Sequence, residues 1–254
     1  MEAVIILSGY YTIASGIKAN QKNIDIIGNN LLNSETAGYR TERSVFSAFE
    51  MEMMSVLSSG RSKVLGDGIG SPVATIDSKR TLFHSGTMEG TNRSLDVAIN
   101  GDGFFNVIGE DGTTYLTRNG GFDLDTEGYL MLPGVGRVLG SSGYIKASGT
   151  GVDIASDGTV TSPNGAVLGR ILVTSPADYG TLERTERGMF TFTGAAPVST
   201  NYQLIQNSLE KSNVDMNIEL TNLVAAQRAF QSCSSALTTV DTLNRRAAQQ
   251  LASL

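Results

Sequence analysis

The sequence contains few of the residues on which catalytic and metal-binding sites most often depend. It has one cysteine, one histidine and no tryptophan in 254 residues. The single cysteine, Cys233, excludes an internal disulfide and a multi-cysteine metal site. The single histidine, His84, excludes a site of several histidine ligands and leaves few groups for acid–base catalysis near neutral pH. We therefore expect no metal, no cofactor and no enzymatic activity.

Charge and long apolar runs are also sparse. Only 17% of the residues are charged, and the net charge of -6 provides no basic surface for nucleic acid. No apolar run approaches the roughly 20 residues of a membrane-spanning helix, so we expect no direct membrane insertion. The chain opens Met1-Glu2, without the basic start of a secretory signal. If it leaves the cell, we expect a route without a cleaved signal peptide.

Glycine is plentiful and proline is not. The sequence has 29 glycines, five prolines and 40% hydrophobic residues. This hydrophobic content is incompatible with disorder throughout, and the length suffices for one large or two modest domains with a buried core. Many glycines with few prolines favour numerous tight turns, which a β-rich body requires.

An apolar stripe with helical spacing occupies residues 10–33. Its members are four and three residues apart in strict alternation, which places them along one face of a helix. They are Ile13, Ile17, Asn20, Ile24, Ile27 and Leu31. Gly16 and Gly28 each weaken such a helix by roughly 1 kcal/mol relative to alanine. A helix of this strength needs a partner face.

A second stripe of the same kind occupies the C-terminal end, where neither glycine nor proline occurs from Ser208 onward. Ser212 or Asn213 is the expected helix cap, with Asp215 in the first turn. The stripe consists of Leu223, Ala226, Phe230, Cys233, Leu237, Val240, Asn244, Ala247 and Leu251. Forty helical residues measure roughly 60 Å, too long for this stripe to fold upon itself. We expect the two terminal helices to pair in a coiled-coil-like module.

Polar residues on or beside the stripes leave two interpretations open. Asn20 and Asn244 are buried amides that fix register and oligomeric state, or they face solvent on an imperfect stripe. Gln227 and Arg228 lie off the stripe and either make polar contacts between subunits or form an ordinary solvated face.

The middle of the chain, residues 71–211, has the pattern of short antiparallel strands. Short apolar or alternating runs are separated by Asp-Gly and Asn-Gly pairs, which suit hairpin turns. We therefore predict an α+β fold in which residues 1–39 and 212–254 form a discontinuous helical core and residues 71–211 form a β-rich outer domain. Residues 40–70 are a connector whose structure is a helix, an extended arm or a hairpin.

Three constellations invite a chemical interpretation. Asp123, Asp125 and Glu127 have the spacing that opens a calcium loop, but position 12 is Gly134 instead of glutamate, which favours a hairpin turn. The glycine-rich stretches 66–70 and 134–140 lack dinucleotide spacing and are predicted to be turns. Cys233 lies on the apolar stripe, where cysteine packs as a small hydrophobe, so a dyad with His84 is disfavoured.

Three segments in order resemble bacterial flagellar rod and hook proteins. The first includes Ala14-Ser15-Gly16 and then residues 26–40, in which Asn29, Asn30 and Leu31 lead to Asn33, Thr36, Gly38 and Tyr39. The second is Leu95–Phe105 followed by Tyr115–Gly120. The third extends from Ser212 to Phe230 and contains Gln227 and Arg228. Gly28, Leu32 and Ala236 depart from the residues common in that family.

The resemblance implies a structural subunit of the flagellar basal-body rod. Such a subunit is exported by the flagellar type III apparatus without signal cleavage and assembles within the cell envelope or periplasm, with its terminal helices in the tubular core. It implies self-association into a helical polymer and contacts with other rod and hook subunits and with the export apparatus. Chain length favours a large rod subunit, and the nearly complete first segment favours a distal over a proximal position.

Two other functions remain as alternatives. A secreted adhesin-like β domain on a helical stalk would carry its ligand surface in residues 71–211. A hydrolase would use carboxylates such as Asp96 or Asp102, which lie in turn-like contexts.

Overall fold

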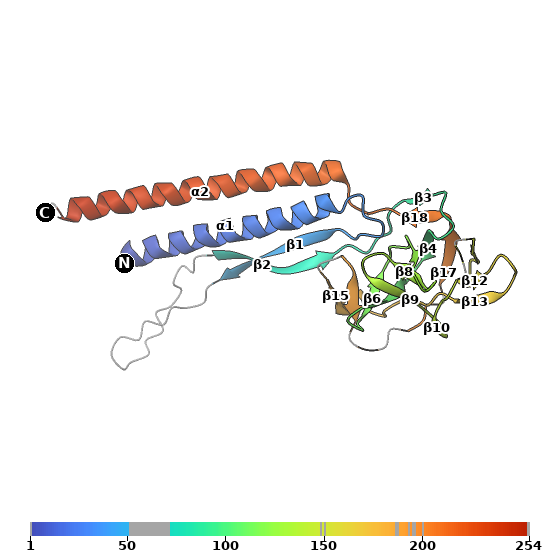
Figure 1. Ribbon diagram of the computed structural model, residues 1–254. Coiled ribbons are helices and arrows are strands. Elements are labelled where there is room, and N and C mark those ends of the chain that lie inside the picture. Colours follow the sequence, from blue (N-terminus) through green and yellow to red (C-terminus); the bar gives the residue numbers. More distant parts are fainter. Residues whose placement is uncertain are drawn as a thin grey trace, which may run out of the picture. The chain divides into compact units, whose positions relative to one another are not determined.

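The computed structural model describes residues 2–50, 72–147, 149, 151–185, 188–192, 194, 197–199 and 201–252. It contains long helices at the two ends, α1 (Glu2–Leu32) and α2 (Met216–Ala252), and antiparallel strands between them (Figure 1). The predicted α+β fold with a β-rich middle is confirmed. The glycine-rich stretch 66–70 lies outside the described residues.

The chain divides into two compact units. The first, here called the helical unit, comprises residues 1–32, 42–82 and 215–254. The second, here called the β body, comprises residues 33–41 and 83–214. Within the described residues, no helix combines the length and hydropathy needed to cross a membrane.

The helical unit combines α1 and α2 with a pair of antiparallel strands, β1 (Glu42–Glu50) and β2 (Pro72–Thr81). The register of this pair shifts between Val45 and Phe46. Helix α1 packs against α2 and also against both strands. Of the predicted connector, residues 42–50 are therefore strand, and residues 51–70 lie outside the described part.

The C-terminal helix begins later than its predicted start at residue 212. Helix α2 starts at Met216, and the Asp215 carboxylate accepts hydrogen bonds from the backbone N–H groups of Asn217 and Ile218. Asp215 is therefore the cap, because its oxygen satisfies two N–H groups that have no partner in the first turn. The prediction that Ser212 or Asn213 caps this helix is wrong, and both residues belong to the β body.

Within its described residues, the β body consists of short strands in four sheets. The strands are β3 (Met88–Gly90), β4 (Val97–Gly101), β5 (Phe104–Gly109), β6 (Thr114–Thr117), β7 (Asp123–Leu124), β8 (Leu130–Leu132), β9 (Gly136–Gly140), β10 (Gly143–Tyr144), β11 (Asp153–Ile154), β12 (Thr159–Thr161), β13 (Val167–Arg170), β14 (Val173–Thr174), β15 (Leu182–Arg184), β16 (Phe190–Phe192), β17 (Tyr202–Gln206) and β18 (Ser208–Glu210). The largest sheet has the order β15-β16-β6-β5-β9-β8-β7, with β10 on β9 and β14 on β5.

Two of the other sheets join distant parts of the chain. Strands β11, β12 and β13 form one sheet, while β17 pairs with β4 and β18 pairs with β3. Gln206 lies opposite Val97, so strands more than a hundred residues apart are neighbours. The last strands before α2 therefore close the β body onto its first strands.

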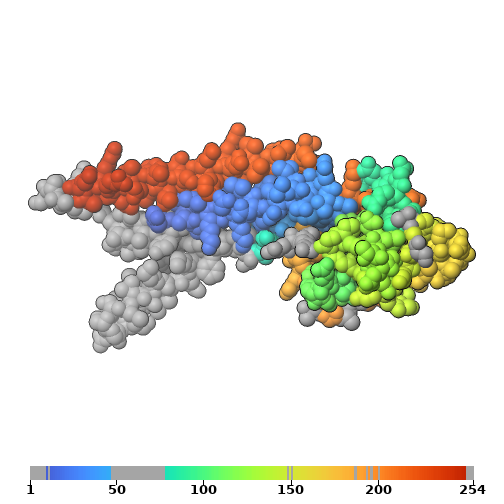
Figure 2. Space-filling view, in the orientation of Figure 1, coloured from blue at the N-terminus to red at the C-terminus, as the bar shows by residue number. Residues whose placement is uncertain are grey.

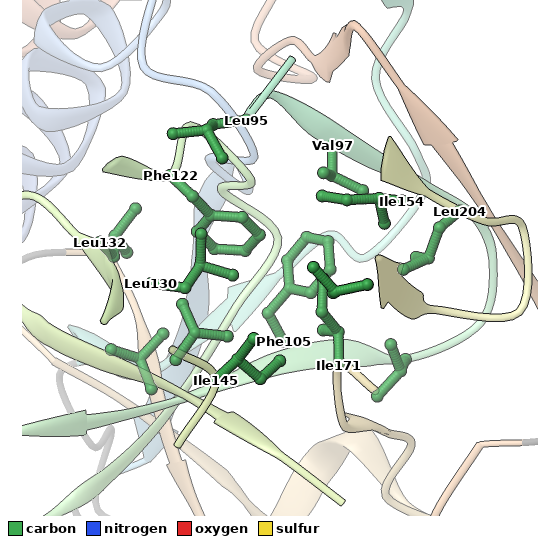
Figure 3. Close-up of a cluster of buried hydrophobic side chains, with 14 of the residues drawn as sticks. Leu95, Val97, Phe105, Phe122, Leu130, Leu132, Ile145, Ile154, Ile171 and Leu204 are labelled. Atoms are coloured by element: carbon green, nitrogen blue, oxygen red, sulfur yellow. The ribbon is translucent and has the colours of Figure 1, made fainter. Parts of the chain in front are cut away.

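A continuous apolar core fills the β body between these sheets (Figure 3). Val97, Phe105 and Phe122 have no exposed surface, and the rings of Phe105 and Phe122 meet edge to face at 5.0 Å. Burial of each such aromatic or aliphatic side chain stabilises the fold by roughly 1.5–3 kcal/mol. A second cluster of Phe104, Leu116 and Phe190 packs against Phe83. The β body thus has the core of an independent domain.

Candidate assembly interface

A small-residue contact joins the two helices of the helical unit. A Cβ atom on Gly16 would lie 3.4 Å from the Sγ atom of Cys233, so the missing side chain lets α2 approach α1 closely. The Asn20 amide donates to the backbone oxygen of Gly16 at 2.9 Å and lies 3.9 Å from Cys233 Sγ. Asn20 therefore faces α2, and Cys233 packs as a small hydrophobe.

Asn30 connects three elements of the helical unit. Its buried amide exchanges two hydrogen bonds with the backbone of Glu42, at 2.8 and 3.0 Å, as a paired strand residue would. The same Nδ2 atom donates to Glu219 of α2 at 3.4 Å. This side chain fixes the start of β1 against α1 and reaches the first turns of α2. The neighbouring Asn29 is exposed.

The remaining predicted interface residues differ in burial. Ile27 and Ala226 are buried, and Gln227 is exposed. The others whose side chains the structure describes are partly buried: Ile13, Ile17, Ile24, Leu31, Leu223, Phe230, Cys233, Leu237, Val240 and Asn244. Leu251 belongs to α2, but its side chain lies outside the described part.

Sequence reasoning missed a second buried face of α1. Ala19 and Ile26 are buried although neither belongs to the predicted stripe. Helix α1 packs against β1 and β2 as well as α2, so more of its surface is covered than one stripe. The continuous apolar pair Ile26-Ile27 was the available signal, since one narrow stripe does not account for two consecutive buried positions.

The helical unit exposes most of the large apolar side chains that face solvent. Nine of the fourteen such residues whose side chains are described belong to it: Tyr10, Leu32, Val45, Phe46, Met216, Ile218, Leu220, Val224 and Leu243. Met216, Leu220 and Val224 repeat every four residues, so they share one face of α2. Figure 2 shows α2, orange to red, with an open face along the helix. Exposed apolar surface on this scale is typical of an interaction site.

The loop after α1 belongs to the β body. Residues 33–41 pack there, and the Gly38 N–H donates to the backbone oxygen of Glu210 at 2.7 Å. Gly38 has φ +69°, and a Cβ atom on it would lie 2.4 Å from the carbonyl carbon of Arg118. Glycine is therefore required at this position by both conformation and space. Tyr39 is buried beneath the guanidinium of Arg184, whose Cζ atom lies 4.3 Å from the ring centroid.

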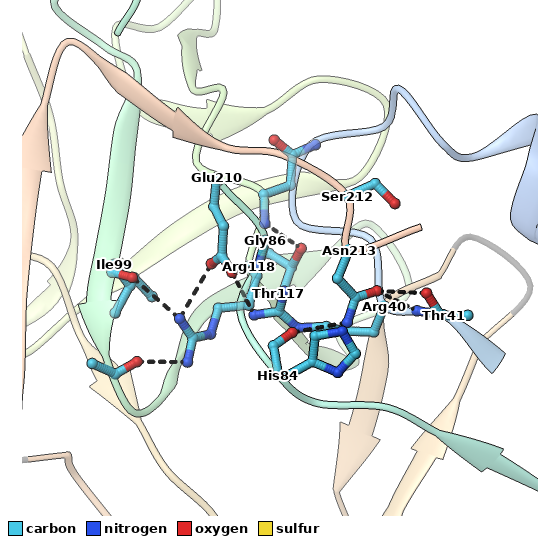
Figure 4. Close-up of polar contacts among 12 residues, drawn as sticks. Arg40, Thr41, His84, Gly86, Ile99, Thr117, Arg118, Glu210, Ser212 and Asn213 are labelled. Atoms are coloured by element: carbon cyan, nitrogen blue, oxygen red, sulfur yellow. Dashed lines mark hydrogen bonds and ion pairs between the residues drawn. The ribbon is translucent and has the colours of Figure 1, made fainter. Parts of the chain in front are cut away.

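A buried ionic cluster fixes this loop to the last strand of the β body (Figure 4). The Glu210 carboxylate is fully buried and pairs with Arg40 at 2.7 Å and Arg118 at 3.2 Å. It also accepts the Gly86 N–H at 3.0 Å. Arg118 donates further to the backbone oxygens of Ile99 and Gly101. Burial lowers the pKa of Arg118, and the nearby Glu210 carboxylate opposes that shift.

The carboxylates with calcium-loop spacing serve a turn and ion pairs. Asp125 accepts the N–H groups of Glu127 and Tyr129 between β7 and β8. Asp125 and Glu127 bind the guanidinium of Arg137, at 2.7 and 2.8 Å. Among the described residues, no group of three or more histidine, cysteine, aspartate or glutamate side chains could hold a metal ion.

The other candidate catalytic groups have no reactive partners in the described part of the chain. Asp96 is buried with Arg93 at 3.8 Å, whereas Asp102 is exposed beside Asn201. A hollow of about 230 Å³ lies beside the loop after α1, and it contains no carboxylate, imidazole or thiol among its lining residues. The described side chains thus offer packing surfaces and buried ion pairs.

Three family models match the chain in order. Residues 11–40 match the flagella basal body rod protein model, residues 98–162 the flagellar hook protein FlgE/F/G D1 domain, and residues 205–250 the flagellar basal body rod FlgEFG protein C-terminal. These regions cover α1 with its following loop, the centre of the β body, and the return into α2.

Whole-length relatives agree with these matches. The chain is 32% identical to the flagellar basal-body rod protein FlgG of Bacillus subtilis, over 93% of this chain and 96% of the relative. It is 30% identical to FlgG of Borreliella burgdorferi, over 94% and 96%. It is 32% identical to the rod protein FlgF of Caulobacter vibrioides, over 91% and 92%. The motifs, the terminal helices and these full-length similarities show that the chain belongs to the flagellar basal-body rod protein family.

Proposed function

We propose that this rod subunit polymerises through its terminal helices into the axial shaft that transmits torque to hook and filament. Its membership of a family of structural rod proteins makes it a structural subunit of the flagellar basal body, not an enzyme. The observation that supports polymerisation most is the distribution of apolar surface. Among the described side chains, nine large apolar residues of the helical unit are exposed, whereas the apolar residues of the β body are mostly buried.

The pairing of α1 and α2 is the first step of this mechanism. We propose that the helices pair in a coiled-coil-like manner around Gly16, Asn20 and Cys233. The composite surface then packs against neighbouring copies. Heterologous contacts that do not close on themselves generate an open helical filament. Each large apolar side chain buried between subunits adds roughly 1.5–3 kcal/mol, which offsets the ordering of the chain ends.

The proposed assembly interface follows the predicted stripes. In α1 and its end it comprises Ile13, Ile17, Asn20, Ile24, Ile27, Asn29, Asn30 and Leu31. In α2 it comprises Leu223, Ala226, Gln227, Phe230, Cys233, Leu237, Val240, Asn244 and Leu251. To these we add the exposed residues Leu220 and Val224. Exposure of Gln227 suits a polar contact with a neighbouring copy.

We retain the predicted domains as part of the proposal, with residues 1–39 and 212–254 in the filament core and residues 71–211 outside it. One change follows from the compact units. Strands β1 and β2 belong to the same compact unit as the helices, and residues 33–39 and 212–214 belong to the β body.

Membership of the rod protein family supports a proposal for the assembly partners and the export route of this subunit. We propose contacts with other rod and hook subunits and export of the unfolded chain by the flagellar type III apparatus, without signal cleavage. Assembly then takes place within the cell envelope. We favour a distal over a proximal position in the rod. No observation favours the adhesin alternative.

Replacement of Phe230 and Leu237 by aspartate tests the proposal. Both side chains are partly buried on the stripe of α2, so two carboxylates there should prevent helix pairing and assembly. We expect soluble protein with a folded β body, no subunit in isolated basal bodies, and no swimming. The matched control is Gln231→Asp with Thr238→Asp, which places the same charges one residue further along on exposed positions. Normal swimming of the Phe230 and Leu237 variant would refute polymerisation through this stripe.

A further inference from the structure

The polypeptide passes between the β body and the helical unit at a small number of peptide bonds. Residue 41 is followed by the helical unit, residue 83 follows it, and residue 214 precedes it. Thr41, His84 and Asn213 each lie at, or one residue from, one of these three crossings and belong to the β body. A fourth crossing, between residues 32 and 33, enters the other end of the segment that contains Thr41, residues 33–41. Any force that passes from one unit to the other through the covalent chain therefore passes through one of these three segments.

One side chain joins all three segments. Asn213 Oδ1 accepts hydrogen bonds from the N–H and the hydroxyl of Thr41, both at 2.7 Å (Figure 4). Its Nδ2 atom donates to the backbone oxygen of His84 at 2.8 Å. The Asn213 backbone N–H donates to the oxygen of Tyr39 at 3.3 Å. The side-chain amide supplies the acceptor and the donor of this arrangement on two separate atoms.

A second residue joins the same segments one layer deeper in the β body. The Glu210 carboxylate binds Arg40 from the first segment and the Gly86 N–H from the second. The backbone adds the bond from Gly38 to Glu210 and the bond from Lys211 to Thr87, at 2.7 and 2.8 Å. Glu210 and Asn213 are three residues apart, so the three segments are bonded together at two successive levels. The hydrogen bonds to the Glu210 carboxylate involve a charged group and are therefore stronger than hydrogen bonds between neutral groups.

We propose that Asn213, supported by Glu210, is a clamp that makes the three segments carry load as one mechanical link. This inference rests on the proposed function, because it assigns a role in torque transmission to residues outside the assembly interface. Without the clamp each segment would transmit force through its own soft backbone dihedrals. With it, displacement of one segment is resisted by the hydrogen bonds to the other two.

Amide hydrogen exchange of the purified full-length protein tests the clamp without assembly. In Asn213→Ala the Thr41 N–H loses its acceptor, and we expect its exchange to accelerate by about tenfold, as loss of one intramolecular hydrogen bond predicts. In Asn213→Asp the acceptor remains and the donor to His84 is lost, so the Thr41 N–H should stay protected. Asn217→Ala, an exposed position just beyond the clamp, is the control. Unchanged exchange in Asn213→Ala would overturn the clamp.

Rotation under load tests its mechanical role. We expect Asn213→Ala rods to assemble and to turn at wild-type speed under low viscous load, and to slow or break at loads near stall. Equal performance at all loads would overturn the inference while leaving the proposed function intact. Normal swimming of the Phe230 and Leu237 variant would instead refute the proposed function, on which the inference rests. If Asn213→Ala rods do not assemble, Thr41→Val removes one bond of the clamp while Thr41→Ser retains it. That pair must then differ at high load.

Discussion

Ionic side chains in the interior of the β body are arranged around one acceptor. Glu210 accepts from Arg40, Arg118 and the Gly86 N–H, so a single carboxylate neutralises part of two buried cations. A buried ion pair is weak evidence for net stabilisation, but removal of one partner leaves an uncompensated charge. The three charged residues come from three distant parts of the sequence. Their individual chemistry gave no sign that they meet.

Glu210→Gln should destabilise the β body by about 3–5 kcal/mol, because two buried guanidinium groups lose their counterion. The matched control is Lys211→Gln. Lys211 pairs with Glu89 on the surface, where both side chains are more than half exposed, so its loss should change stability far less than loss of Glu210. Urea denaturation followed by tyrosine fluorescence measures both. Equal midpoints for the two variants would contradict this account of the cluster.

Two carboxylates that lie in turns make the stability of the fold depend on pH in the acidic range. Hydrogen bonds from the Tyr115 hydroxyl and the Thr113 N–H lower the pKa of Asp111. Hydrogen bonds from the N–H and hydroxyl of Thr159 lower the pKa of Asp157. A lowered folded-state pKa means that these groups stabilise the fold above the unfolded value of about 3.9, and that this stability is lost as pH falls below it.

The double variant Asp111→Asn with Asp157→Asn should therefore lose stability at pH 7 and lose less on acidification than the parent protein. Thermal unfolding between about pH 6 and pH 2 measures the difference in Tm, which should narrow as the carboxylates become protonated. A difference that stays constant or widens toward low pH would show that the two turn carboxylates do not act as described.

Among the elements, α1 packs against the other three elements of the helical unit. It packs against α2 through Gly16 and against β1 and β2 through its opposite side. The stripe spacing predicted the first contact because periodicity is a local property of the sequence. The second was not predictable, since β1 and β2 are separated by residues whose sequence gives no pairing signal. The late start of α2 was missed because Ser212 and Asn213 are good caps that bond instead with the β body.

Gly16 permits a direct prediction about helix packing. Gly16→Ala should keep the two helices together and add roughly 1 kcal/mol of helix propensity, because the new Cβ meets only the Cys233 side chain, at 3.4 Å. Gly16→Ile should push α2 away, since the added branches have no room between the helices. Circular dichroism at 222 nm during thermal unfolding should give the higher midpoint to the alanine variant. A higher midpoint for isoleucine would contradict close packing at this point.

In the β body, the turns were predictable from local sequence, whereas the pairing of distant strands was not. Asp-Gly and Asn-Gly pairs marked turns that the structure contains, including Asp157-Gly158 between β11 and β12. The strand order was not predictable, because β17 and β18 return from the far end of the chain to pair with β4 and β3. Likewise, the ion pairs of Arg137 with Asp125 and Glu127 depend on β9 lying beside β8. The sequence indicated the turn, but it did not indicate that Arg137 would pair with the carboxylates of that turn.

On the scale of the whole chain, charge and apolar surface are segregated. The segments of the β body contain 15 acidic and 9 basic residues, whereas those of the helical unit contain 10 of each. The entire net charge of -6 therefore belongs to the β body, and the unit that exposes most apolar surface is neutral. Neutral apolar surfaces associate without long-range repulsion, while an acidic body remains solvated. This division fits a subunit whose ends join and whose body stays outside.

Photocross-linking in intact basal bodies tests the central claim, that the exposed face of α2 is an interface between rod subunits. A benzophenone amino acid placed at Leu220 or Val224 should yield, on illumination, covalent products of this subunit with a second copy or with another rod protein. The same probe at Val167, exposed on the β body, is the control and should yield few such products. Products with rod subunits from Val167 alone, with none from Leu220 or Val224 in rods that rotate normally, would contradict the account.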